Sequence, residues 1–265
     1  MSKVFKQTLL DLKDKSRQGY IGDLYYDTIT MEDFTSLYSK LSPTTRRPRY
    51  LYNHKNLILQ VRMPASRHED IVDQLKEMIN TKLRAAGIDR ATTWSNLAPL
   101  YTFGHVSAEP DGCWGPASDN NPTIIMEVGN SETSGQLLLD GRHWLENIHS
   151  SVQVSILVKL KKNPDVIQIS IWELDRSRFL RPLRSPLTNH RLATRTQFAE
   201  ITRSDPIHRV TVSSTYSLSD LRIPFAIFTG PSPPTGVNMA GDMIISQQDL
   251  LDLGRFHFVA RNGYV

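Results

Sequence analysis

Two carboxylates, Asp111 and Glu127, combine residue types and a spacing that could do chemistry. Asp111 follows a proline, Glu127 ends the apolar run TIIM, and fifteen residues lie between them. The intervening segment carries Gly112, Gly115 and the turn DNNP, so it can fold back and set both carboxylates on neighbouring strands. Adjacent carboxylates repel unless one is protonated or a cation lies between them. Mg²⁺ or Mn²⁺ suits such a pair and can activate a water beside a phosphoryl oxygen, so the spacing predicts a metal-dependent phosphodiesterase site.

Each carboxylate also has a simpler interpretation. Asp111 precedes Gly112 and can make a turn, since aspartate and glycine are both frequent turn residues. Glu127 can end its strand and pair with a basic side chain such as Arg142. The residues alone leave both interpretations open.

The elements that would position this pair follow from hydrophobic periodicity and capping residues. Ser66 to Glu69, SRHE, has the pattern of a capping box, and apolar residues then recur at helical spacing as far as Gly87. Further helices are predicted at 3–16, 27–38, 134–147 and 246–253, a hairpin at 50–63, and strands at 123–126, 152–160, 167–174 and 211–215. Residues 175–215 are otherwise hard to assign. This order predicts one α/β or α+β domain with a mixed sheet.

Composition narrows the class of protein. The 265 residues carry a formal charge of +4 and a pI of about 9.1, which permits a phosphate-rich partner without requiring one. The single cysteine, Cys113, excludes an intrachain disulfide and a Cys-based zinc site. The N-terminus has no secretory signal pattern, and no apolar run approaches the roughly 20 residues of a membrane helix. We therefore expect an intracellular protein, cytoplasmic or nuclear, with no membrane partner.

The hairpin ending in MP, the helix that opens with His68 and Glu69, the segment EPDGCW and the segment PTIIMEVGNSE occur in a familiar order. Over roughly residues 49–160 this pattern resembles the PD-(D/E)XK nuclease superfamily, and within it uncharacterised fungal members and bacterial proteins described as endonucleases. The resemblance implies a restriction-endonuclease-like fold, a central mixed sheet flanked by helices. It divides the chain into an N-terminal helical extension (1–48), a core (49–175) and a C-terminal extension (176–265) expected to pack on the core.

Carried over residue by residue, the resemblance makes Asp111 and Glu127 metal ligands. A glutamate on the first helix often joins such a site, so Glu69 is a third ligand candidate, with the capping box as its structural alternative. The departure is Gly129, which stands where the superfamily has its lysine. Arg142 on the following helix and Lys159 on the next strand are the two candidates for the missing cation; arginine can bind phosphate but cannot serve as a general base.

Two functions follow from this pattern. The first is a divalent-metal-dependent nuclease that hydrolyses phosphodiester bonds, with DNA expected rather than RNA and a homodimer as one option. The second is a catalytically inactive relative that keeps the fold as a binding or protein-interaction module, which Gly129 motivates. Arg176, Arg178, Arg181 and Arg184 suggest either a phosphate-binding stripe or a solvated connector. Trp144 is expected in the core and His143, beside it, on the surface.

Overall fold

The chain forms two compact units in the computed structural model. The first unit comprises residues 1–69 and 98–110, and the second comprises residues 70–97 and 111–265. The structure describes residues 2–41, 48–63, 66–96, 99–129, 134–161, 165–174, 192–203, 209–214, 220–230 and 240–259. The predicted arginine stripe, from Arg176 to Arg184, lies outside these residues.

The first unit packs two helices on an antiparallel sheet. Its described strands follow the order β1-β3-β2-β6-β5. The elements are α1 (Lys3–Arg17), β1 (Gly22–Tyr26), α2 (Met31–Leu41), β2 (Arg49–Asn53), β3 (Ile58–Met63), β5 (Tyr101–Phe103) and β6 (Val106–Ala108). Buried side chains from both helices and from β2 and β3 form one apolar cluster.

Local sequence explains these elements. The Ser2 hydroxyl accepts a hydrogen bond from the Phe5 amide at 2.9 Å, and the Thr30 hydroxyl accepts one from the Asp33 amide at 3.1 Å, so each helix begins at a side-chain cap. The predicted hairpin is confirmed as β2 and β3. Its inward side chains alternate, with Leu59 and Val61 fully buried.

The second unit is built on a larger mixed sheet. Among the strands that the structure describes, the order is β12-β11-β10-β9-β8-β7-β4, with β8 and β9 parallel and the other neighbours antiparallel. The strands are β4 (Thr93–Asn96), β7 (Gly112–Pro116), β8 (Ile124–Gly129), β9 (Val154–Lys161), β10 (Val166–Leu174), β11 (Ala193–Thr202) and β12 (Arg209–Ser214). A two-stranded ribbon, β13 (Leu221–Pro224) and β14 (Asp242–Ile245), adjoins α5 (Phe225–Thr229) in sequence.

Helices cover both faces of this sheet. On one face, α3 (Ser66–Ala85) and α6 (Gln247–Val259) pack on strand residues such as Met126, Val128 and Ile156 in the main apolar core. On the other face lies α4 (Ser134–Glu146), where a Cβ added at Gly141 would stand 2.6 Å from Leu157 Cδ2. The predicted fold class, a mixed α/β sheet flanked by helices, is confirmed. Within the described residues, none of the helices combines the length and apolar character needed to cross a bilayer.

The long helix α3 ends as its sequence indicates. Gly87 has a φ of +79°, and the Ile88 amide donates to the Leu83 carbonyl at 2.9 Å, which closes the last turn in a Schellman arrangement. The first four residues of α3 fall in the first unit and the remainder in the second.

Some elements lie where the sequence carries no clear signal. β11 lies within the segment that is hard to assign, because its polar and apolar residues alternate without a turn signal that marks its ends. The apolar run IPFAIF is divided between two elements, since β13 ends at Pro224 and α5 begins at Phe225. In the first unit the hairpin β2–β3 shares its core with the N-terminal helices, and the division into segments 1–48, 49–175 and 176–265 stays a prediction.

Gly115 on β7 provides a test of the packing between β7 and β4. A Cβ there would lie 2.6 Å from the Trp94 ring and 2.7 Å from the Asn121 carbonyl oxygen. Neither the backbone nor the ring can retreat easily, so Gly115→Ala should lower the free energy of unfolding by about 1–3 kcal/mol. Urea denaturation would measure this. The control Gly241→Ala, whose Cβ would make ordinary contacts at 3.5 Å, should change stability by less than about 0.5 kcal/mol. Equal effects would contradict the packing described.

Candidate active site

Asp111 directly precedes β7, and Glu127 lies on the neighbouring strand β8 of the second unit. β7 pairs antiparallel with β8 from Gly112↔Met126 onward, so one step before the paired residues Asp111 comes level with Glu127. Directly opposed residues of an antiparallel pair have Cβ atoms about 4.5–5.5 Å apart and share one face of the sheet. The two residues are 1% and 5% exposed, respectively. The structure therefore brings the predicted pair together in a buried setting, where a charge requires partners.

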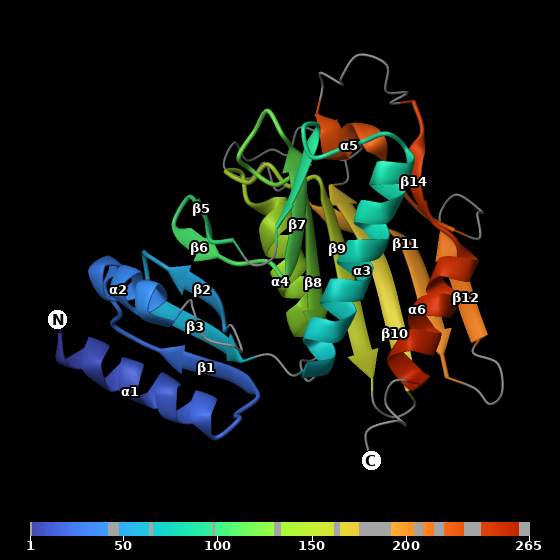
Figure 1. Ribbon diagram of the computed structural model, residues 1–265. Coiled ribbons are helices and arrows are strands. Elements are labelled where there is room, and N and C mark those ends of the chain that lie inside the picture. Colours follow the sequence, from blue (N-terminus) through green and yellow to red (C-terminus); the bar gives the residue numbers. More distant parts are fainter. Residues whose placement is uncertain are drawn as a thin grey trace, which may run out of the picture. The chain divides into compact units, whose positions relative to one another are not determined.

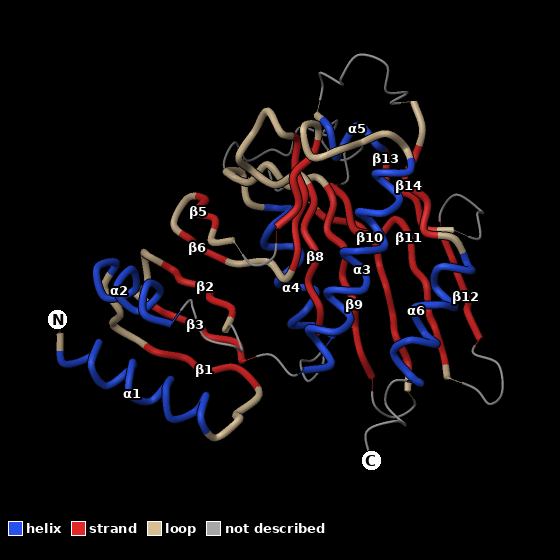
Figure 2. Tube along the Cα trace, viewed as in Figure 1, coloured by secondary structure: helices blue, strands red, loops and turns tan. Residues whose placement is uncertain are grey.

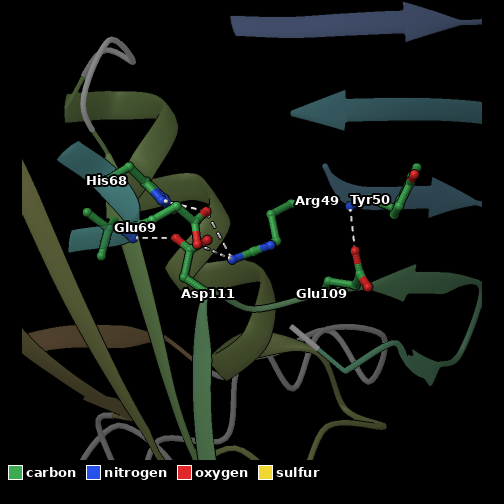
Figure 3. A network of polar contacts seen from close by, with 7 residues as sticks. Arg49, Tyr50, His68, Glu69, Glu109 and Asp111 are labelled. Carbon is green, nitrogen blue, oxygen red and sulfur yellow. Dashed lines mark hydrogen bonds and ion pairs between the residues drawn. The ribbon is translucent and has the colours of Figure 1, made fainter. Parts of the chain in front are cut away.

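The Asp111 carboxylate is fixed to the end of β8. Its Oδ2 accepts a hydrogen bond of 2.8 Å from the Val128 backbone N–H (Figure 3). The pairing of β7 with β8 begins one residue later, at Gly112. The Asp111 side chain therefore supplies to the Val128 amide the acceptor that a strand carbonyl would otherwise provide. This bond holds the carboxylate level with the Glu127–Val128 peptide.

The Glu127 carboxylate is held from α4. Trp144, itself 2% exposed, donates its indole N–H to Glu127 Oε1 at 2.7 Å. Trp144 is a core residue, as its sequence position predicted. Its hydrogen bond to Glu127 was not predicted, because a periodic apolar position does not reveal what its polar atom meets. A carboxylate has about four acceptor sites, so this bond is compatible with metal ligation as well.

Lys159 stands beside the position where the expected lysine is absent. β8 and β9 pair in parallel with Gly129 opposite Lys159 and Glu127 opposite Leu157. Since side chains alternate between faces, Lys159 projects from the same face as Glu127, and it is partly buried. Strands are about 4.8 Å apart, so the lysine on β9 can cover the space that the glycine on β8 leaves.

Arg142 is engaged in a different interaction. Its guanidinium donates from Nε and Nη2 to the two carboxylate oxygens of Glu146 at 2.7 and 3.1 Å, and this hydrogen bond raises the pKa of Arg142. Glu146 Oε1 also accepts from the Ala193 backbone N–H at 2.9 Å, at the start of β11. Arg142 is thus paired with Glu146, whose carboxylate contacts β11. In the sheet, β11 is separated from β8 by β10 and β9.

Glu69 belongs to the first unit, at the start of α3. Figure 3 shows its carboxylate beside Arg49, whose Nη2 lies 3.3 Å from Glu69 Oε1, and His68 Nδ1 lies 3.5 Å from the same oxygen. His68 is 2% exposed and packs in the interior. The Ser66 side chain lies outside the described residues, so the predicted capping box stays a prediction, as does a ligand role for Glu69.

A further buried carboxylate in the first unit, Glu109, has a structural role that the sequence did not reveal. Its Oε2 accepts from the Tyr50 backbone N–H at 3.1 Å and its Oε1 accepts from the Tyr38 hydroxyl at 3.0 Å. The first of these bonds appears in Figure 3. Glu109 therefore joins α2, β2 and the segment after β6 within one unit.

The donor set of the second unit suits a hard divalent cation. Asp111, just before β7, and Glu127, on β8, offer carboxylate oxygens, and Mg²⁺ is commonly bound by one or two carboxylates with water and substrate oxygens completing its shell. No group of three or more His, Cys, Asp or Glu side chains suited to a metal occurs in the part of the chain that is described. The fit is therefore to a two-carboxylate site.

Comparison with known proteins gives little beyond the structure itself. No protein-family model matches the chain, and no curated protein matches it. One solved structure, from Anabaena variabilis and described as a "putative nuclease belonging to DUF820", aligns with 85% of this chain and 99% of its own, at 14% identity and a TM-score of 0.44. That likeness is too distant to support an argument.

The Trp144–Glu127 bond yields a stability prediction. Trp144→Phe removes the donor to a buried carboxylate and should cost roughly 1–3 kcal/mol of unfolding free energy. In a Glu127→Met background the same change should cost less, so the double-mutant cycle should show coupling of about 1 kcal/mol or more.

Trp114→Phe is the matched control for this cycle, because the indole of Trp114 donates to the neutral Asn80 amide at 2.9 Å. Its cost should be nearer to about 1 kcal/mol, the value of a neutral hydrogen bond. Additive effects of Trp144→Phe and Glu127→Met in denaturant unfolding would contradict the proposed coupling.

His143, next to Trp144, gives a pH prediction. It was expected on the surface but is partly buried, and burial lowers its pKa while nearby Asp140 opposes the shift. The unfolded chain therefore binds this proton more readily. The contribution of neutral His143 to the free energy of unfolding is fully present above a pH of about 6.5. It is lost as the pH falls through the lowered pKa of His143 in the folded protein.

Urea denaturation between a pH of about 7.5 and about 5 should show this loss. The wild type should lose more unfolding free energy over that range than His143→Gln, which cannot titrate. If the unfolding free energies of the two proteins changed in parallel with pH, the predicted effect of His143 would be contradicted.

Proposed function

We propose that the protein is a divalent-metal-dependent nuclease that hydrolyses phosphodiester bonds of nucleic acid, with DNA as the expected substrate. The observation that carries the proposal is the strand register of the second unit. It places Asp111 opposite Glu127 and, on the next strand, Lys159 opposite Gly129. Two carboxylates and one amine are then grouped at one end of the sheet, where the carboxylates could hold a divalent ion that activates water and the amine could offset charge on a phosphate. The sequence resemblance to the PD-(D/E)XK superfamily points to the same reaction.

Asp111 and Glu127 would hold Mg²⁺ or Mn²⁺, and the bound ion would supply an activated water and charge stabilisation at the phosphate. The chain's own contribution is to keep the two carboxylates close and oriented. The Val128 amide does this for Asp111 and the Trp144 indole for Glu127. Lys159 would place its ammonium beside the phosphate and offset the negative charge that develops there.

Between the two candidate cations, the register favours Lys159 over Arg142. Lys159 is the cross-strand neighbour of Gly129, whereas Arg142 is paired with Glu146 through two hydrogen bonds. Glu69 is kept as a third ligand candidate on the resemblance alone. A nuclease of this kind would act inside the cell, in the cytoplasm or the nucleus.

One observation favours the alternative, a catalytically inactive binding or protein-interaction module. Each carboxylate already accepts a hydrogen bond from the protein, Asp111 from a backbone amide and Glu127 from an indole. These bonds would equally suit two buried carboxylates with a purely structural role, Asp111 holding the end of β8 and Glu127 holding α4. In that case divalent metal would not stabilise the protein.

Cleavage assays separate the two functions. Wild-type protein is incubated with plasmid DNA, single-stranded DNA and RNA in Mg²⁺ or Mn²⁺, beside Asp111→Asn, Glu127→Gln and Lys159→Met. Each substitution should lower the cleavage rate by about 100-fold or more, because each removes a group that faces the reacting phosphate or its metal. Lys161→Met, an exposed lysine two residues along β9, is the matched control and should retain activity.

Metal binding is measured in the same proteins by thermal unfolding. Mn²⁺ at about 100 times its dissociation constant should add ~2.7 kcal/mol to the wild type and much less to Glu127→Gln. Cleavage that survives the Asp111→Asn/Glu127→Gln double substitution would sink the nuclease assignment. A protein that neither cleaves any of the substrates nor gains stability from Mn²⁺ or Mg²⁺ would support the inactive module.

A further inference from the structure

An open cavity of about 740 Å³ lies between α3 and β4 in the second unit. Among the strands that the structure describes, β4 is the last of its sheet, so the cavity lies at the sheet edge. Asp73, Lys76 and Asn80 line it from α3, Arg90 from the segment after that helix, and Ser95 from β4. The three α3 residues recur at spacings of three and four, so they share one face of the helix.

Two cations of this cavity are not neutralised by the protein. Within the described residues, Lys76 and Arg90 form neither an ion pair nor a hydrogen bond. The nearby carboxylate of Glu77 is occupied by Arg84, whose Nη2 lies 2.6 Å from Glu77 Oε1. Asp73 is exposed on the helix surface. Two positive charges therefore line the cavity beside one exposed carboxylate.

The surroundings of Lys76 disfavour its charge. Burial lowers the pKa of Lys76, and the neighbouring charge of Arg90 lowers it further. Asp73, Glu77 and the Cys113 thiol act in the opposite direction without cancelling the effect. Like charges held together repel unless an opposite charge lies between them. An anion in the cavity would remove this repulsion.

Asn80 offers a neutral donor beside the two cations. The Trp114 indole donates to Asn80 Oδ1 at 2.9 Å. Because an indole N–H only donates, the amide oxygen of Asn80 must face Trp114. The amide nitrogen is then the polar atom of Asn80 that remains for a ligand, and it is a donor.

Ser95 turns its backbone N–H toward the open edge of the sheet. The Ala117 amide donates to the Thr92 carbonyl at 2.9 Å, and β4 continues antiparallel to β7 with Ser95 opposite Trp114. Hydrogen-bonded and non-hydrogen-bonded pairs alternate in such a ladder, so Ser95, three residues after Thr92, belongs to a non-hydrogen-bonded pair. Its backbone N–H and its hydroxyl are therefore two further donors at the cavity.

We propose that this cavity is a phosphate-binding site, in which Lys76 and Arg90 supply charge and Asn80 and Ser95 supply neutral hydrogen-bond donors. A phosphate group has only acceptor oxygens, and charge-assisted hydrogen bonds from lysine and arginine are the strong ones. The occupant would be a backbone phosphate of a nucleic-acid strand. β4 is the neighbour of β7, which begins directly after Asp111, so the cavity lies one strand from the candidate active site. The nucleic-acid occupant rests on the proposed function, whereas phosphate binding itself does not.

Binding is tested without activity, by acylating lysines with a succinimidyl ester and measuring each one by mass spectrometry. At an inorganic phosphate concentration ten times the dissociation constant, labelling of Lys76 should fall by about tenfold, because only the unliganded fraction reacts. Labelling of Lys161, which is exposed on β9, should not change. Chloride at equal ionic strength should protect neither lysine.

Arg90→Met should abolish the protection of Lys76 by phosphate, since the site then has one cation. Arg255→Met is the matched control, because Arg255 is an exposed arginine of α6, and this variant should keep the protection. If phosphate fails to protect Lys76 in the folded wild type, or if Arg90→Met leaves the protection intact, the phosphate site is overturned.

The nucleic-acid occupant is tested by fluorescence anisotropy with a single-stranded oligonucleotide, without divalent metal so that no strand is cleaved. Lys76→Met and Arg90→Met should each weaken binding for every sequence. Each should also reduce the slope of log affinity against log salt by about 0.7, the value of one single-strand phosphate contact. Lys161→Met should change neither quantity.

The outcomes separate the site from its occupant and from the reaction. Phosphate protection with unchanged oligonucleotide affinity would support a site for a small phosphate ligand and overturn the nucleic-acid strand as its occupant. If the wild type cleaves no substrate, the nuclease function fails, while the protection of Lys76 and the salt slopes still decide the phosphate site.

Discussion

The central constraint on the second unit is the presence of two carboxylates at the end of strands that are otherwise buried and apolar. Burying an unpaired charge costs several kcal/mol, so the surrounding structure must supply donors or a cation. The Val128 amide reaches Asp111, and the Trp144 indole reaches Glu127 from the helix behind the sheet. The first bond ties the residue before β7 to the end of β8, and the second ties α4 to the same strand.

The two faces of the sheet then take different roles. α3 and α6 cover the face that carries Met126, Val128 and Ile156, and that side is the apolar core. The opposite face carries Glu127, Lys159 and Gln168 along with α4. Because alternate residues of one strand point to opposite faces, a single run such as IIMEVG serves both the core and the candidate site.

The parallel pairing of β8 and β9 sets a lysine opposite the glycine that stands in place of the expected lysine, and the proposed role of Lys159 rests on this register. The position two residues after Glu127 has no side chain, and the paired position on the next strand has an amine. Gln168 on β10 and Glu200 on β11 add further polar side chains to this face of the sheet and are linked by a hydrogen bond of 2.6 Å.

The sequence by itself determined several of the local elements and predicted a chemistry for Asp111 and Glu127. The capping serine and Gly87 predicted α3, alternation predicted the hairpin β2–β3, and the spacing of Asp111 and Glu127 predicted a carboxylate pair. Only the tertiary structure decided what surrounds that pair. The register of Gly129 with Lys159, the Trp144–Glu127 bond and the contact of Glu146 with the Ala193 amide join residues through strand pairing or helix packing. Periodicity reports which face a residue occupies, but it carries no information about which residue of another element lies opposite.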